Sequence, residues 1–469
     1  MVGIKSYGAY IPIYRLKQET IGQAWGRPPR QGEKAVANFD EDSLTMATES
    51  SINCLAGLDQ ARPGGVFFAS TTAPYKEKQT SSILAAALDL SNPIRSADFG
   101  GSLRSGTIAL RAAIDAVKGG LKNVLVGAAD SRLAEPGGDQ EPQIGDAAAS
   151  LLIGDSDVAV EIEDAFTICD DFLDTWRKAS DIYVLASDSR FSQSRGYMRN
   201  MEEAVKGLLQ QTDLRPGDFA KAIFQSADAR GHLALAKKLG FEASQVQDPL
   251  VGSVGYCGAA HALLMLVAAL DEARPGERLL LVNYGDGCDA FVLRATEKLG
   301  QLRARRSLKA YLGDSKSLTP YQKYLKFRGL VVGEKGHDPF SSPIMYWREQ
   351  NQYLRLHGVR CRSCGRVQYP MVRVCRGCRA KDNFDEISMS RKGQVFSFEI
   401  DHYFPTPDPP TVMAEVDMEG GGRILLQMTD LDVAKVQVGM SVELALRSMH
   451  HGAKFINYYW KCRPIRGGG

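Results

Sequence analysis

The stretch that decides the fold is ADFGGSLRSGTIALRAAIDAV, residues 97–117. It is typical of the end of a strand, a glycine turn and the start of a helix, which begins near Gly106. One face of this helix is apolar and comprises Ala109, Leu110, Ala113 and Val117. A second strand, KNVLVGAAD, follows it, so the stretch predicts a strand–helix–strand unit of an α/β protein.

The same order of features recurs about 150 residues later in the chain. Gly258 precedes the apolar helix AAHALLMLVAALD, and the strand RLLLVNYGDG follows that helix. Two unrelated strand–helix units would give the same pattern, because such units are common. We interpret the recurrence as a duplicated unit that occupies the chain up to about residue 298.

Composition and charge exclude several classes of protein. The chain has 469 residues, 44% hydrophobic and 24% charged, with a net charge of +2, so it offers no general attraction to nucleic acid or anionic membranes. Its longest apolar run, residues 262–270, is far short of the ~20 residues that span a bilayer. We therefore expect a cytoplasmic protein of two or three domains without a membrane segment.

The chain divides into five expected regions. The duplicated unit predicts two halves, residues 1–165 and 166–298. Residues 299–342 are polar and basic, and we expect a linker arm. Residues 343–384 predict a helix followed by a cysteine-rich segment. Residues 385–469 contain five short alternating strands and predict a small β-barrel of the OB-fold type.

Four cysteines form two tight pairs, and each pair is separated by two residues: Cys361, Cys364, Cys375 and Cys378. Two such knuckles supply the four thiolates that tetrahedral Zn²⁺ requires. A closed four-thiolate shell leaves no open position, so we expect a structural zinc ribbon. Six arginines flank the knuckles, which is consistent either with balancing of the thiolate charge or with a surface that binds the phosphates of CoA or nucleic acid.

Two resemblances follow from these motifs. The segment from about residue 343 to 464, with its four cysteines and GQVFSFEIDHYF, resembles the zinc-ribbon/OB-fold domains that accompany thiolase-like acyl-CoA enzymes. Residues 1–298, with DFGGSLRSGTIALRAA, GDAAASLLIGD and NYGDGCDAF, resemble hydroxymethylglutaryl-CoA synthase and the thiolase superfamily. The resemblance implies an α/β thiolase-like duplicated five-layer core, a CoA thioester as substrate and a homodimer formed through that core.

The three residues that carry the chemistry of hydroxymethylglutaryl-CoA synthases are replaced here. By motif, the acylated cysteine corresponds to Leu103, the histidine to Gln225 in FQSADARGH and the glutamate to Thr71 in ASTTAPY. Leucine cannot form a thioester, so acyl transfer through residue 103 is excluded.

Our first hypothesis is a changed reaction, the (retro-)aldol cleavage of a 3-hydroxyacyl-CoA, which needs no covalent intermediate. Candidate catalytic residues on the expected loops are Tyr75, Tyr256, His261 and Asp286, with Asp289 as a further one. Tyr256 is the strongest, because a helix N-terminus behind it would lower the pKa of its phenol, although a packing role is equally consistent. Arg230 is the candidate contact for CoA.

Two other hypotheses remain open. Cys257 or Cys288 could replace the lost thiolate in an acyltransferase, although buried cysteines are more often small hydrophobic residues. The chain could also be a non-catalytic scaffold that binds CoA. We do not expect nucleic acid as a partner, because the charge is balanced and no aromatic–basic stripe is present.

Overall fold

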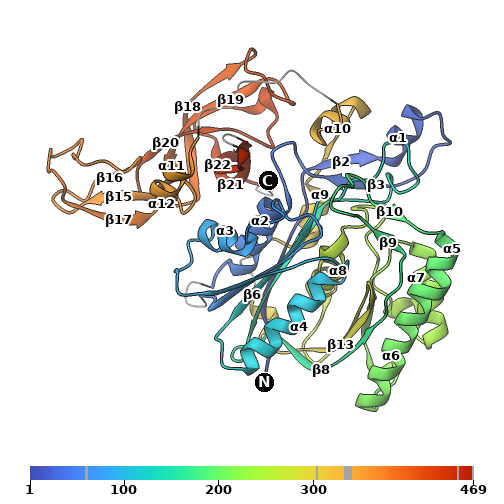
Figure 1. Cartoon of the computed structure of the whole chain (residues 1–469). Coiled ribbons are helices and arrows are strands. Elements are labelled where there is room, and N and C mark those ends of the chain that lie inside the picture. Colours follow the sequence, from blue (N-terminus) through green and yellow to red (C-terminus); the bar gives the residue numbers. More distant parts are fainter. Residues whose placement is uncertain (59–61, 303–304, 332–340, 452–453, 467–469) are drawn as a thin grey trace. The chain divides into compact units, whose positions relative to one another are not determined.

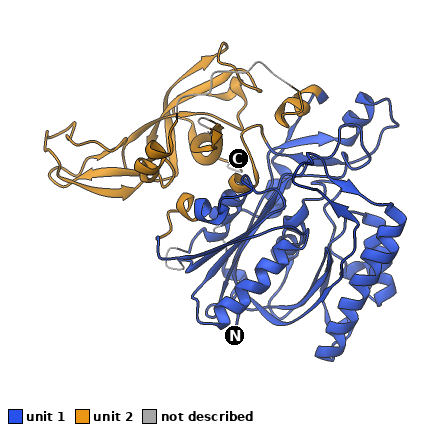
Figure 2. Ribbon diagram, in the orientation of Figure 1, with its two compact units in different colours: residues 1–37, 46–84, 92–321 blue, residues 38–45, 85–91, 322–469 orange. Residues whose placement is uncertain are grey.

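The computed structural model describes residues 1–58, 62–302, 305–331, 341–451 and 454–466. The chain forms two compact units, which Figure 2 shows in different colours. Unit 1 comprises residues 1–37, 46–84 and 92–321, and unit 2 comprises residues 38–45, 85–91 and 322–469. None of the described helices is both long and apolar enough to cross a membrane.

Unit 1 is built on a sheet with the strand order β11-β12-β13-β8-β1-β7-β6-β4-β5. Its strands are β1 (Gly3–Tyr10), β4 (Gly65–Ala69), β5 (Arg95–Phe99), β6 (Val124–Asp130), β7 (Ala147–Gly154), β8 (Val160–Cys169), β11 (Lys221–Phe224), β12 (Arg278–Tyr284) and β13 (Gly287–Ala295). β4 pairs with β6 in parallel, and β6 with β7 antiparallel. β11, β12 and β13 repeat this arrangement, so the predicted duplication is confirmed.

Helices cover both faces of the two halves of the sheet. α4 (Ser105–Lys118) and α8 (His261–Glu272) pack against each other and against strands of both halves (Figure 1). α2 (Ser43–Leu55) contacts β1 and β7 on an outer face, beside α3 (Thr80–Ala87). α6 (Met198–Thr212) and α7 (Ala229–Leu239) cover β8 and β11–β13. These layers match the expected five-layer core.

The amino-acid sequence explains why the two central helices lie so close together. β6 and β7 are buried along their whole length and consist mainly of Ala, Val, Leu and Ile, as expected of strands covered on both faces. α4 approaches the start of α8 at Gly106, where any Cβ would collide with the carbonyl oxygen of Ala259. The glycine therefore brings two helix N-termini to one place.

Smaller elements complete unit 1. They are β2 (Tyr14–Lys17), α1 (Gln18–Ala24), β3 (Glu33–Val36), β9 (Thr175–Trp176), β10 (Leu185–Ala186), α5 (Ser189–Phe191), the π-helix η1 (Ser192–Tyr197), the short helix η4 (Gly258–Ala260), α9 (Leu308–Gly313) and β14 (Lys316–Ser317). The segment expected as a linker arm contains α9, β14 and α10 (Tyr321–Phe327), and its residues 332–340 lie outside the described part of the chain.

Unit 2 contains a three-stranded and a five-stranded sheet. Their strands are β15 (His357–Cys361), β16 (Val367–Gln368) and β17 (Phe384–Ser388), and β18 (Lys392–Asp401), β19 (Thr411–Met418), β20 (Arg423–Gln427), β21 (Ser441–His450) and β22 (Asn457–Pro464). A bridge between Met428 and Cys462 nearly closes the larger sheet into a barrel. The expected leading helix is instead two short helices, α11 (Pro343–Arg348) and α12 (Gln350–Tyr353), because Glu349 leaves the helical conformation (φ −106°, ψ 9°).

A buried ionic cluster holds segment 38–45 within unit 2. The guanidinium group of Arg447 is completely buried and contacts the carboxylates of Glu41 and Asp430 at 2.5 Å each and that of Asp40 at 3.4 Å. Lys461 also contacts Asp40, at 2.8 Å. Because each charge has an opposite partner, the cost of burying the cluster is offset.

Candidate active site

The turn that carries Leu103 is fixed by a buried arginine. The Nη1 atom of Arg104 lies 3.1 Å from Oδ1 of Asp289 and donates to the carbonyl oxygen of Ile168 at 3.0 Å, and Nη2 donates to the carbonyl oxygen of Asp286 at 3.1 Å. Thr107 donates to Asp289 as well, at 2.7 Å. The carboxylate of Asp289 therefore joins the start of α4 to β13.

Leu103 lines a cavity of about 260 Å³. All of its walls belong to unit 1 and come from loops that follow β4, β5, β6, β8 and β12. The lining residues are Thr71, Gly101, Ser102, Leu103, Arg132, Asp171, Phe172, Leu173, Asp174, Thr175, Trp176, Arg177, Val184, Gly285 and Asp286. The position that by motif corresponds to the family's nucleophile is thus at a cavity, as expected, and five of the fifteen lining residues are charged.

The two other replaced positions form hydrogen bonds with protein groups. The hydroxyl of Thr71 donates to Oδ2 of Asp130 at 2.9 Å, and its backbone N–H donates to Oδ1 at 2.7 Å. The amide Nε2 of Gln225 donates to the hydroxyl of Tyr256, and Oε1 accepts from the backbone N–H of Tyr284 at 3.3 Å. Neither side chain can exchange a proton at neutral pH, so these positions do not supply an acid or a base.

Tyr256 and His261 lie together beneath the cavity wall. Their rings meet edge to face with centroids 4.9 Å apart, and Arg132 lies over the Tyr256 ring at 5.8 Å. Burial raises the pKa of Tyr256, so the expectation that a helix N-terminus would lower it is wrong. Burial also lowers the pKa of His261 to about 4, and its Nδ1 accepts from the backbone N–H of Cys257 at 3.3 Å. Both side chains are therefore neutral at pH 7.

The remaining predicted residues are dispersed. Asp286 is exposed, has a φ of 48° and lines the cavity. Tyr75 is half-buried and lies outside the cavity lining. Arg230 is exposed in the first turn of α7, where its backbone N–H is capped by Asp228. The structure thus brings Asp286 to the cavity, places Tyr256 and His261 behind it, and leaves the other two outside its lining.

The two alternative cysteines are poor nucleophiles in this environment. Cys257 and Cys288 are completely buried, and burial raises the pKa of each thiol well above its usual value. The thiol of Cys288 lies 3.5 Å from the sulfur of Met201 in the hydrophobic core between α6 and the sheet. Both fit the role of small hydrophobic residues.

Four charged cavity residues were missed by the sequence analysis: Arg132, Asp171, Asp174 and Arg177. Asp174 has a raised pKa, mainly because of burial, while the hydroxyl of Tyr284 and the backbone N–H of Thr175 act in the opposite direction. Burial lowers the pKa of Arg132, and Arg177 donates to the carbonyl oxygen of Thr71 at 2.5 Å. The available signal was the run DDFLDTWRK, an acidic, aromatic and basic stretch directly after β8. Asp174 is the carboxyl group best suited to proton transfer in this cavity.

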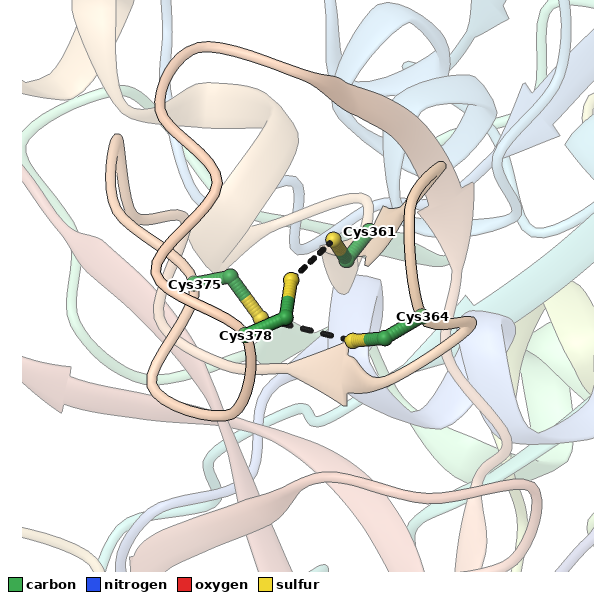
Figure 3. Close-up of side chains that lie close together, drawn as sticks. All are labelled: Cys361, Cys364, Cys375 and Cys378. Carbon is green, nitrogen blue, oxygen red and sulfur yellow. Dashed lines mark hydrogen bonds between the residues drawn. The ribbon is translucent and has the colours of Figure 1, made fainter.

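The four paired cysteines converge in unit 2, as Figure 3 shows. Their sulfur atoms all lie within 4.8 Å of one another, with Cys361 and Cys378, and Cys364 and Cys375, 3.6 Å apart. A tetrahedron with metal–sulfur bonds of about 2.3 Å has edges of about 3.8 Å. The cluster therefore has the donor set and the spacing to hold a metal ion.

Comparisons with known proteins agree with the fold and with the two-part organisation. Residues 209–294 match the family model "3-Oxoacyl-[acyl-carrier-protein (ACP)] synthase III C terminal", and residues 386–447 match "ChsH2, C-terminal OB-fold domain". A solved structure of HMG-CoA synthase complexed with CoA superposes with a TM-score of 0.64 at 18% identity, over 73% of this chain and 92% of that one. A curacin-pathway HMG synthase in complex with an acetyl donor-ACP gives 0.62 at 19% identity, over 82% and 99%. The fold is therefore thiolase-like, with an OB-fold domain.

Sequence relatives define the family more narrowly. The hydroxymethylglutaryl-CoA synthase of Aeropyrum pernix is 36% identical over 346 residues, which cover 71% of this chain and 96% of that protein. The synthase of Caldivirga maquilingensis is 34% identical over 344 residues, covering 70% and 98%. At this identity and coverage, the chain belongs to the hydroxymethylglutaryl-CoA synthase family.

Proposed function

We propose that this protein is an enzyme that acts on CoA thioesters and catalyses a carbon–carbon bond step of the aldol type in the Leu103 cavity, without forming an acyl-enzyme. The observation that carries the proposal is the position of Leu103. It occupies the turn before α4 at the edge of a charged cavity, where a thiolate would be needed for covalent acyl transfer. The relatives support the substrate class, since their names specify CoA thioesters.

The relatives also bear on the direction of the reaction. They are synthases, which supports condensation over the cleavage named as the first hypothesis. The acyltransferase alternative also forms the carbon–carbon bond, but through an acyl group on Cys257 or Cys288. The relatives reported above are named for synthesis and not for cleavage. An aldol step is common to both directions, because addition of a thioester enolate to a ketone is the reverse of cleavage of the tertiary alcohol. We therefore propose condensation first and retain cleavage of a 3-hydroxyacyl-CoA as the second candidate.

In the proposed reaction, Asp174 exchanges the proton. For condensation, its carboxylate removes a proton from the carbon next to the donor thioester, and the resulting enolate forms a bond to the ketone carbon of the acceptor. The alkoxide then takes up a proton, which gives the hydroxyl group. Arg132 and Arg177 supply positive charge for the developing oxyanions, and the N-terminus of α4 adds to it. Tyr256, held neutral, is a hydrogen-bond donor behind Arg132.

Three further assignments belong to this proposal. Zn²⁺ is the metal that fits the four-cysteine cluster, in a structural role. Arg230 remains the proposed contact for CoA. A homodimer through unit 1 is supported by β5, an edge strand whose outer side pairs with no other strand among the described residues. Light scattering at micromolar concentration tests the dimer, and a monodisperse monomer would contradict it.

The function is tested by incubating the full-length protein with a panel of 3-oxoacyl-CoA and 3-hydroxyacyl-CoA esters, each with and without a second acyl-CoA. Mass spectrometry of the CoA products then gives the reaction. Condensation yields one heavier thioester, whereas cleavage yields a shorter thioester and a carbonyl compound. Binding of CoA esters without any turnover across the panel would instead support the non-catalytic scaffold.

A further inference from the structure

A second cavity lies within unit 2 and shares no lining residue with the Leu103 cavity. It is a groove of about 490 Å³ between the cysteine-rich ribbon and the turn that joins β19 to β20. Its lining residues are Arg366, Val367, Gln368, Tyr369, Arg376, Asp417, Met418, Gly421, Gly422 and Arg423. We propose that this groove, defined here as the ribbon groove, binds the phosphate groups of a nucleotide-sized ligand.

The ribbon groove carries positive charge that its own carboxylates do not compensate. Arg423 is neutralised, because its Nε and Nη2 atoms donate to the two carboxylate oxygens of Asp417 at 2.7 and 3.0 Å. Among the described residues, no carboxylate lies within 4.0 Å of the guanidinium groups of Arg366 or Arg376. Both side chains are exposed. The groove therefore keeps two positive charges that are available to an anion, and arginine is the side chain best suited to grip phosphate in two places.

The wall of the groove also contains a hydrogen-bond donor without a partner, the side-chain amide of Gln368. Gln368 is only 6% exposed, and its Oε1 accepts from the backbone N–H of Arg376 at 2.8 Å. Its Nε2 has no hydrogen-bond partner, although a buried amide normally finds one. This atom has less than 1 Å² of accessible surface, so a ligand oxygen reaches it only once the Gln368 side chain shifts toward the groove. Arg366 and Arg376, which are exposed, are the groups that meet a ligand directly.

The opposite wall of the groove is a turn of three glycines between β19 and β20. Residues 420–422 are glycines with φ of 83°, 105° and 88°, values that other residues rarely adopt. At Gly421 a Cβ would lie 3.1 Å from Val367, so the turn stays close to the ribbon only without a side chain. The volume of the ribbon groove, about 490 Å³, lies within the range of about 300–1,000 Å³ that is typical of small-molecule sites. The groove is therefore large enough for a nucleotide.

The test is direct binding of pyrophosphate, ADP and CoA to the full-length, metal-loaded protein, by calorimetry at low salt. The test variant is R366Q/R376Q. The control is R379Q, which removes one positive charge beside the second knuckle, at a residue outside the groove lining. We expect wild type and R379Q to bind pyrophosphate within twofold of each other, and the double variant to bind at least tenfold more weakly. Tighter binding of ADP or of CoA than of pyrophosphate then identifies the source of the phosphates.

Measurement of the metal content distinguishes phosphate binding from the alternative in which Arg366 and Arg376 only balance the negative charge of the cysteine thiolates. The proposal requires that R366Q/R376Q keeps its metal and thermal stability while losing pyrophosphate. The proposal is overturned if the wild-type protein binds no pyrophosphate, or if R366Q/R376Q binds pyrophosphate as tightly as wild type does. Loss of the metal from R366Q/R376Q with unchanged binding of pyrophosphate would also overturn it. The difference in binding between wild type and R366Q/R376Q isolates the ribbon groove, because neither arginine lines the Leu103 cavity, so the test is independent of the reaction there.

Discussion

The side-chain amide of Gln225 donates a hydrogen bond to the hydroxyl of Tyr256. By motif, Gln225 corresponds to the family's histidine, so we infer that a neutral donor stands where the family has a proton-exchanging group. The hydroxyl of Tyr256 accepts this bond and keeps its own proton, because burial raises the pKa of the phenol. Tyr256 is thereby set up to donate a hydrogen bond rather than to act as a base.

Replacing Asp174 tests the proposed proton exchange. We expect D174N to lower kcat about 100-fold or more, in line with general acid–base contributions. D171N is the matched control, since Asp171 lines the same cavity but is exposed, and it should retain most of the activity. Equal losses in both variants would remove Asp174 from the mechanism.

The same variant has a predicted effect on stability. Burial raises the pKa of Asp174 in the folded state, so the folded protein binds a proton more tightly than the unfolded chain. Stability therefore falls as pH rises through and above the usual carboxyl range. D174N removes this penalty, and we expect its Tm at pH 7 to equal or exceed that of wild type. A clearly lower Tm would show that the carboxylate is structural.

Tyr256→Phe separates a hydrogen-bond donor from a proton-transfer group. Because Tyr256 lies behind Arg132 and outside the cavity lining, we expect kcat to fall about tenfold, through loss of the hydrogen bond between its hydroxyl and Gln225. Tyr256→Phe should retain the pH dependence of kcat that is due to Asp174 and that D174N abolishes, because Tyr256 does not ionise near neutral pH. A loss below fivefold would assign Tyr256 to packing alone.

The zinc prediction is tested by C364S. Loss of one thiolate should lower metal content and destabilise unit 2, because a structural zinc site contributes about 10 kcal/mol or more to folding. C169S is the control, as Cys169 is an exposed cysteine outside the cluster. A folded unit 2 that carries no stoichiometric zinc, in wild type or C364S, would be incompatible with this assignment.

Acid should weaken unit 2 through the Arg447 cluster. Burial alone raises the pKa of Asp430, but Arg447 and Arg463 outweigh it and lower the pKa to about 2. A lowered pKa stabilises the fold above the unfolded value, and this stabilisation is lost as pH falls from about 4 towards 2.

R447M should destabilise unit 2 by about 3–5 kcal/mol at pH 7, because it leaves buried carboxylates without their partner. The difference between R447M and wild type should then shrink between pH 4 and pH 2. Denaturant unfolding across that range measures it, and a constant difference would contradict the assigned role of Arg447.

Periodicity and spacing were enough to predict the duplicated core, the barrel strands and the four-cysteine cluster, because each depends on contacts that are local or repeated in the chain. The residues that form the Leu103 cavity, and their protonation, were harder to predict from the sequence. Leu103, Thr71 and Gln225 were located by motif, but the pKa of Tyr256 was misjudged, since burial outweighs the helix dipole and cannot be read from neighbours in sequence. Asp174 was missed because it reaches the cavity through a loop after β8, 71 residues from Leu103 in sequence.

The central claim is that catalysis proceeds without an acyl-enzyme, and covalent trapping during turnover tests it most directly. Wild-type protein is incubated with acyl-labelled CoA thioesters, denatured at successive times and digested for mass spectrometry. We predict product formation with no covalent label on any cysteine. A stable acyl adduct on Cys257 or Cys288 that forms at the rate of turnover would contradict the claim and restore covalent acyl transfer.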